Sequence, residues 1–257
     1  MKRDTITYDP EKEEEARSRW YLGPRDKFVL KIVKKFTDLN ASKIILDAGC
    51  GTGGVISSLP STGILKVGND MSSRSLDLGM KSSRITNGIQ ASNTHLPFKD
   101  EIFDISISSE VLEHVGDDLS ALKELCRVTK HRIILTVPAH RYLWTDSDDI
   151  LLHQRRYSKS ELSDLIKKAD MRIVKLKPYG IVPGLLVILY KLLKGTKTKT
   201  VKGTRKKDLP LGTRFEIPKP VEDILRNLFL FDLWLSSKGL LPWGHSWWAC
   251  IEKTKGT

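Results

Sequence analysis

The sequence predicts an α/β fold in which a doubly wound, seven-stranded and mostly parallel sheet is covered by helices on both faces. Three observations lead to this prediction. Short apolar runs alternate with stretches of helical period between residues 43 and 177. A glycine-rich turn follows the first of these runs, where such folds bind their ligands. A further strand-like run, at 246–253, follows a helical insertion near the end of the chain.

The elements are expected in the following order. Residues 24–37 repeat apolar side chains at Phe28, Ile32 and Phe36, a helical spacing with a basic outer face. The runs that should form strands are 43–47, 64–70, 85–91, 103–108, 132–137 and 171–177. The helices expected between them are 53–59, 72–82, 117–129 and 158–169. Because strands that alternate with helices form βαβ units, their sheet should be mostly parallel.

The composition is that of a soluble globular protein, with 257 residues of which 40 % are apolar. Cys50, Cys126 and Cys250 lie far apart and form no Cys-x-x-Cys pair, so neither a disulfide framework nor a metal site is expected. The charged N-terminus has no signal-peptide core, and no apolar run reaches the roughly 18 residues of a membrane span. We therefore expect a cytoplasmic protein. The net charge of +12 would suit nucleic acid, but most of the excess lies after residue 180.

The segment 44–54, IILDAGCGTGG, carries the strongest signal for a ligand. A buried strand ends at Asp47 and breaks into Gly49, Gly51 and Gly53. Without Cβ atoms the backbone can turn sharply and lie against a ligand, and the next helix offers free N–H groups to an anionic group. The spacing Gly49-x-Gly51-x-x-Gly54 also matches the dinucleotide fingerprint. Hydride transfer and a tight turn without any ligand therefore remain alternatives.

Two carboxylates bear on the choice of cofactor. Asp47 precedes the first glycine by two residues, where it can face the positive aminoacyl end of S-adenosylmethionine and would repel a pyrophosphate. Asp70 ends the second strand, about 20 residues further on, where an acid can accept both ribose hydroxyls of either cofactor. Asp47 thus favours S-adenosylmethionine over a dinucleotide.

The run 95–115, HLPFKDEIFDISISSEVLEHV, makes the pattern specific. Together with ILDAGCGTG and VGNDMS at 67–72, it resembles the class I S-adenosylmethionine-dependent methyltransferases, in the type 11-like branch that is akin to the quinone-biosynthesis methyltransferases. The resemblance covers residues 43–177. In this fold an antiparallel pair normally completes the sheet, and 171–177 and 246–253 are its candidate members.

The resemblance implies roles for individual residues. The glycines would form the cofactor loop, Asp47 would organise it together with the methionine amine, and Asp70 would bind the ribose. The residues expected to contact the cofactor are Asp47, Gly49, Gly51, Gly53, Asp70, Met71, Ser92, Asn93, Ser109 and Glu110. The family usually has an acid where Ser92 stands, so Ser92 or Asn93 would accept the adenine hydrogen bond less strongly than a carboxylate. Glu113 and His114 either line the mouth of the site or serve only capping and packing.

The segment 136–157 follows the fifth strand and should form the rim where the acceptor enters. Methyl transfer needs in-line positioning and a dry site, and a neutral hydroxyl acceptor also needs a base. We predict that His153 is this base. The alternative is that His153 and Arg156 only tie the loop to the domain through salt bridges. The residues expected to contact the acceptor are His140, Arg155, Arg156 and Tyr157.

Four segments are expected along the chain: a helical cap (1–40), the methyltransferase core (41–179), an insertion (180–240) and a final strand segment (241–257). The insertion joins a short apolar run at 181–193 to a basic, Gly/Thr-rich stretch at 194–208, which we expect to be a mobile loop, and to a helix at 218–238. Apolar and cationic surface together favour an anionic membrane interface. The alternative is that the apolar run packs on the domain while the lysines stay solvated.

These features predict a methyltransferase that uses S-adenosyl-L-methionine and acts on a small-molecule or lipid-linked acceptor, such as a quinone, a polyprenol-linked sugar or a glycolipid. Its place would be the cytoplasm or the inner face of the membrane. An RNA methyltransferase is one alternative, although the Asn-Pro-Pro-Tyr motif of many N-methyltransferases is absent and Ser108, Ser109 and Glu110 stand there instead. A non-catalytic, cofactor-binding regulatory subunit is the other. The methylated atom and the oligomeric state are left open.

Overall fold

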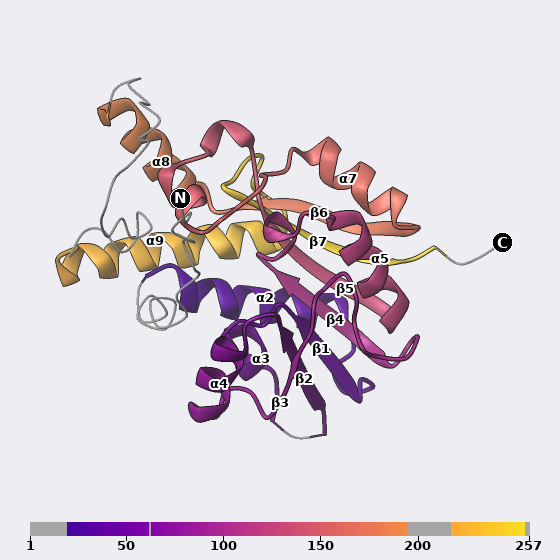
Figure 1. Ribbon diagram of the computed structural model, residues 1–257. Helices are drawn as coiled ribbons and strands as arrows, with labels where there is room; N and C mark the ends of the chain where they lie inside the picture. The colour runs from indigo at the N-terminus through magenta and orange to yellow at the C-terminus, as the bar shows by residue number, and fades with distance from the viewer. Residues whose placement is uncertain (1–19, 62, 195–216, 255–257) are drawn as a thin grey trace, which may run out of the picture.

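The computed structural model describes residues 20–61, 63–194 and 217–254 (Figure 1). Seven strands form one sheet in the order β3-β2-β1-β4-β5-β7-β6. Strands β1 to β5 are parallel, and β7 runs antiparallel between β5 and β6. The strands are β1 Ile44–Ala48, β2 Leu65–Asp70, β3 Asn87–Gln90, β4 Phe103–Ser109, β5 Thr129–Pro138, β6 Met171–Tyr179 and β7 Ser246–Lys253. The predicted fold class is confirmed.

Helices cover both faces of the sheet (Figure 1). One face is packed by α2 Leu22–Phe36, α3 Gly54–Ser58, α4 Ser73–Lys81 and α9 Lys219–Lys238. The other is packed by α5 Asp118–Val128 and α7 Lys159–Lys168. The remaining helices are α8 Ile181–Lys194, α6 Asp146–Ile150 and two 3-10 turns, η1 Leu112–His114 and η2 Arg141–Leu143. The helix α6 and both 3-10 turns were not predicted from the sequence.

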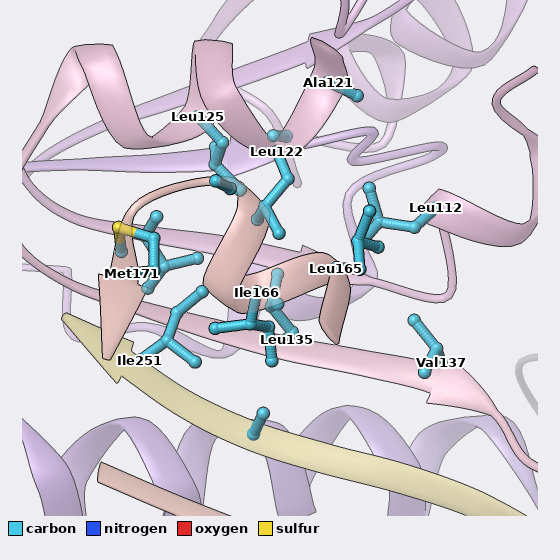
Figure 2. Packing of buried hydrophobic residues seen from close by; sticks show 14 of the residues in the cluster. Leu112, Ala121, Leu122, Leu125, Leu135, Val137, Leu165, Ile166, Met171 and Ile251 are labelled. Atoms are coloured by element: carbon cyan, nitrogen blue, oxygen red, sulfur yellow. The ribbon is translucent and has the colours of Figure 1, made fainter. Parts of the chain in front are cut away.

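Apolar residues at helical spacing form the layer beneath α5 and α7. Leu122 and Leu125 of α5 point toward Ile166 of α7, and Leu135 of β5 lies below them (Figure 2). Burial of one such leucine or isoleucine side chain contributes about 1.5–3 kcal/mol to folding. The central strand β4 is buried along nearly its whole length because helices cover both of its faces. This layered core holds the carboxyl ends of β1, β4 and β5 in fixed positions.

The helices α8 and α9 pack on each other and project from one side of the sheet (Figure 1). The buried carboxylate of Asp232 in α9 accepts hydrogen bonds from the N–H groups of Gly180 and Val182, at 3.2 and 2.9 Å. It thereby caps the first turn of α8. The apolar run at 181–193 is thus helical, and the basic stretch lies outside the described residues from 195 onward. Among the described helices, none has the length and apolar character needed to cross a membrane.

Candidate active site

The strand order reverses between β1 and β4, and the loops after these strands meet at the carboxyl edge of the sheet. Directly after β1, the backbone of Gly49, Gly51 and Gly53 adopts φ values of 74°, 53° and 87°. Residues with a side chain rarely adopt this left-handed conformation. A Cβ atom on Gly49 would also stand 2.6 Å from Cγ2 of Val111. The tight turn therefore requires glycine and leaves its backbone open to a ligand.

Asp47 is buried at the end of β1 and caps the helix that follows the glycine turn. Its Oδ2 atom accepts a hydrogen bond from the backbone N–H of Ile56 in α3, at 3.1 Å. A carboxylate in this place satisfies one of the free donors of the helix N-terminus. Asp47 therefore organises the loop, and its contact with the methionine amine stays a prediction.

Asp70 joins the end of β2 to the same loop. Its carboxylate accepts hydrogen bonds from the backbone N–H groups of Gly51, at 2.9 Å, and Ser72, at 2.8 Å. Burial raises the pKa of Asp70, and the backbone donors of Ser72 and Gly51 oppose that effect. Met71, beside it, has an exposed side chain. The structure thus brings together the glycine turn and the acid predicted to bind the ribose.

Ser92 and Asn93 follow β3 near the end of β2. The Ser92 hydroxyl lies 2.9 Å from the Thr94 hydroxyl, and Oδ1 of Asn93 accepts a hydrogen bond from Nδ2 of Asn69 at 3.0 Å. Asn69 also donates to the carbonyl of Ala91, at 3.3 Å. This network fixes the loop predicted to bind adenine. The contact of Ser92 or Asn93 with the adenine amino group stays a prediction.

Ser109 and Glu110 end β4 at the predicted methionine end of the cofactor. The Ser109 hydroxyl lies 2.9 Å from that of Thr136. Glu110 has a φ of 56°, and the left-handed conformation costs a residue with a side chain roughly 1–2 kcal/mol. Its carboxylate accepts a hydrogen bond from the Tyr179 hydroxyl at 3.0 Å. Such strain persists where surrounding contacts impose it, most often at functional sites.

A buried polar cluster that sequence reasoning missed surrounds Glu110. It is formed by Tyr21, the N-cap residue of α2, by Arg25 of α2 and by Tyr179 of β6, whereas His245 lies beside Arg156. Burial, with the nearby charge of Glu110, raises the pKa of both tyrosines. Burial and the charge of Arg156 lower the pKa of His245 to about 3. The one signal in the sequence was Arg25, which stands three residues before Phe28 and so on the apolar face of the helix at 24–37.

At the rim, Asp148 of α6 binds both His153, the predicted base, and Arg156. Its Oδ1 atom lies 2.8 Å from Nδ1 of His153 and 2.7 Å from Nε of Arg156. Burial would raise the pKa of Asp148, but the hydrogen bonds from His153 and Arg156, with the Arg156 charge, hold it well below its usual range. These contacts are the ones expected if His153 and Arg156 only tie the loop to the domain through salt bridges. A role of His153 as base stays a prediction.

Of the four residues predicted to contact the acceptor, three have their polar groups bound within the protein. Arg155 forms an ion pair with Asp118 at 2.6 Å, and the buried Tyr157 donates its hydroxyl to Asp118 at 2.8 Å. Arg156 is paired with Asp148. His140 differs, because its ring stacks on Tyr142 and lies near Trp243 and Trp247. These aromatic rings pack against one another at the rim.

Glu113 and His114 lie in η1 beside His153. The Glu113 side chain is fully buried, and neither of its oxygens has a hydrogen-bond partner among the described residues. Burial and the Glu110 charge raise the pKa of Glu113, whereas burial and the neighbouring His153 lower that of His114 to about 4. Glu113 is therefore a buried carboxyl group beside His153 and does not lie on the surface.

The strand order and the glycine turn after β1 are those of the class I S-adenosylmethionine-dependent methyltransferase fold. In agreement, residues 46–136 match the model of the methyltransferase domain family. Residues 46–136 are thus similar to a methyltransferase domain, and the fold is that of the S-adenosylmethionine-dependent methyltransferases, as the sequence had suggested.

Known proteins of this class show the extent of the likeness. Demethylmenaquinone methyltransferase of Paenarthrobacter aurescens is 32 % identical over 124 residues, which are 45 % of this chain and 49 % of that protein. Malonyl-[acyl-carrier protein] O-methyltransferase of Buchnera aphidicola is 33 % identical over 102 residues, 39 % of this chain and 41 % of that protein. A methyltransferase structure from Archaeoglobus fulgidus has a TM-score of 0.59 at 15 % identity, covering 96 % of this chain and 100 % of that one. The chain spans about half the length of the curated relatives it matches.

Proposed function

We propose that the protein transfers the methyl group of S-adenosylmethionine to a small-molecule or lipid-linked acceptor. One observation carries the proposal: the glycine turn, bonded through Gly51 to Asp70 at 2.9 Å, shares its edge of the sheet with a buried cluster of ionisable side chains. A cofactor cradle and polar groups at one edge are what a group-transfer site needs. The left-handed glycines and the Asp70 carboxylate beside them suit this cofactor.

The residues would divide the work as follows. The bound cofactor supplies an electrophilic methyl group. The glycine turn and Asp70 would hold and orient it, while α2 with Tyr21 and Arg25 would cover the reacting end and exclude water. Asp148 accepts from Nδ1 of His153, so Nε2 of that ring would be free to take a proton from a hydroxyl acceptor.

Two observations support an apolar or flat acceptor. The relatives named above act, by their names, on a demethylmenaquinone and on a malonyl group carried by a protein. At the rim of this chain, the rings of His140 and Tyr142 stack with centroids 5.1 Å apart. Stacking on aromatic side chains is favourable for a planar ring such as a quinone. We therefore expect a quinone-like or lipid-linked acceptor rather than RNA.

Transfer of a tritiated methyl group into fractionated extracts tests this function. We expect label in the lipid or small-molecule pool, insensitive to ribonuclease. Label confined to a ribonuclease-sensitive pool would instead establish an RNA methyltransferase. Binding of S-adenosylmethionine by calorimetry without any labelled product would point to the non-catalytic regulatory subunit.

We further propose that the insertion at 180–240 brings the enzyme to anionic membranes. Leucines at helical spacing form an exposed stripe on α8, and apolar residues form a second stripe on α9. The members of the stripes are Leu185, Leu189, Leu192 and Leu193, and Val221, Ile224, Leu228 and Phe231. The basic sequence between the two helices supplies the charge that such a surface needs.

Sedimentation with anionic vesicles should recover the protein at low salt and recover less at high salt. Each basic residue near the surface contributes about 1 kcal/mol, and salt screens the attraction beyond roughly 8–10 Å. The double variant Leu189→Ser with Leu193→Ser should lose binding, as should replacement of Lys202, Arg205, Lys206 and Lys207 by Gln. The control is Leu65→Ser, an exposed leucine at the start of β2. A folded, cofactor-bound protein that stays in the supernatant at low salt would refute this membrane role.

A further inference from the structure

The buried carboxylate of Glu113 needs a partner that the other residues described by the structure do not supply. It lies in η1, directly after β4, with its side chain fully buried. Both of its oxygens lack a hydrogen-bond partner within the described ranges. Burial of an uncompensated carboxylate is costly, and buried polar groups in native proteins are nearly always paired. A bound ligand would supply the partner that this carboxylate lacks.

Two imidazole rings face this carboxylate. Nε2 of His153 lies 3.9 Å from Oε1 of Glu113, and Nε2 of His114 lies 4.0 Å from the same oxygen. These separations exceed a hydrogen bond. One atom from each of the three side chains falls within 4.8 Å of the other two. Two histidines and one carboxylate thus converge on a common centre without bonding to each other.

The remaining ring contacts hold the two histidines in place. Nδ1 of His153 is hydrogen-bonded to Asp148 at 2.8 Å, and the backbone of Leu151 makes a hydrogen bond with the His114 ring. Gln154 ties the two segments together, because its N–H donates to the carbonyl of Glu113 and its side-chain amide donates to the carbonyl of His114, each at 2.8 Å. Histidines that bind metals are almost always fixed in this way through the other ring nitrogen.

We propose that Glu113, His114 and His153 bind a divalent first-row transition-metal ion. Imidazole with carboxylate suits zinc, iron, manganese or cobalt, and two histidines with one carboxylate form a known facial ligand set. Metal–nitrogen and metal–oxygen bonds of about 2.0–2.2 Å would draw the three groups together slightly. Three protein ligands leave coordination positions open. If the proposed methyl transfer holds, an acceptor oxygen would occupy one of them, because the cluster adjoins Glu110. Nε2 of His153 would then be a metal ligand, so the ion would take the place of that ring as the group that activates the acceptor.

Metal binding by the purified full-length protein tests the proposal. After removal of bound metal with a chelator and titration with Zn²⁺ or Co²⁺, we expect one ion per chain by elemental analysis and calorimetry, with d–d absorption for Co²⁺. Glu113→Gln and His153→Gln should each weaken binding on the order of 100-fold or more, and Asp148→Asn about 10–100-fold through the ring that it positions. His131→Gln, which changes an exposed histidine at the start of β5, should have no effect.

Two results would overturn the site: a wild-type protein that binds no stoichiometric ion, or an affinity that is unchanged in all the ligand variants. Glu113 would then be a neutral, protonated acid. Because a change at Glu113 can disturb folding, the half-exposed His114→Gln serves as a second ligand variant. Calorimetry with S-adenosylmethionine on the same samples separates the two proposals. A wild-type protein that binds the cofactor but no metal ion contradicts the metal site alone. A wild-type protein that does not bind the cofactor contradicts the methyltransferase function.

Discussion

Replacing Asp148 with alanine is expected to lower the free energy of unfolding by about 3–5 kcal/mol. The Asp148 carboxylate binds Arg156 through Nε at 2.7 Å and Nη2 at 3.1 Å, and it also binds His153. Only 4 % of the Arg156 side chain is exposed. The alanine would leave a buried guanidinium charge without its counter-ion. Urea denaturation at pH 7 measures the loss.

A double-mutant cycle and the pH dependence sharpen this test. Asp148→Ala combined with Arg156→Met should cost less than the sum of the two single changes, because no unpaired charge then remains. The pKa of Asp148 is depressed in the folded protein. Its contribution is therefore complete above the unfolded pKa, about 3.9, and is lost as the pH falls toward the folded value. Below about pH 4 the wild type should lose stability more steeply than Asp148→Ala. A loss under about 1 kcal/mol at pH 7 would contradict the assignment.

Local patterns predicted the sheet because each strand carries its own signal. The strand at 246–253 coincides with β7, since an apolar run buried on both faces is bounded by a turn on one side and by charge on the other. The predicted strand at 85–91 is longer than β3, which spans Asn87–Gln90. Ile85 is buried against α4 and α3 instead of pairing in the sheet. Hydrophobicity alone does not separate these two uses of an isoleucine.

The sequence predicted only those parts of the site whose residues stand close together in one segment. Gly49, Gly51 and Asp47 stand together in the sequence, and the spacing to Asp70 is that of one βαβ unit. Arg25, Glu110 and Tyr179 come from three distant elements, and their meeting depends on how α2 packs over the sheet. The same holds for Glu113 and His153, whose segments are joined by Gln154. This is why neither the composition nor the spacing of the cysteines gave a sign of this metal ligand set.

Gly51→Val is expected to abolish measurable binding of S-adenosylmethionine while leaving a folded protein. Gly51 has a φ of 53°, and its N–H donates to Oδ2 of Asp70 at 2.9 Å. A β-branched residue in this conformation is strained by roughly 1–2 kcal/mol or more, and the loop can relieve the strain only by rotating its backbone. That rotation would turn the N–H away from Asp70 and place a side chain where the cofactor must lie against the backbone.

Gly63→Val is the matched control for this change. Gly63 also has a positive φ, of 78°, but a Cβ atom there would meet nothing within 4 Å, and the residue precedes β2 at the opposite edge of the sheet from the glycine turn. Both variants should lose a similar, small amount of thermal stability from backbone strain, whereas calorimetry should detect cofactor binding only in Gly63→Val and the wild type. Near-normal affinity in a folded Gly51→Val protein would mean that the cofactor does not approach this turn, because a valine at φ 53° cannot leave the loop as it is.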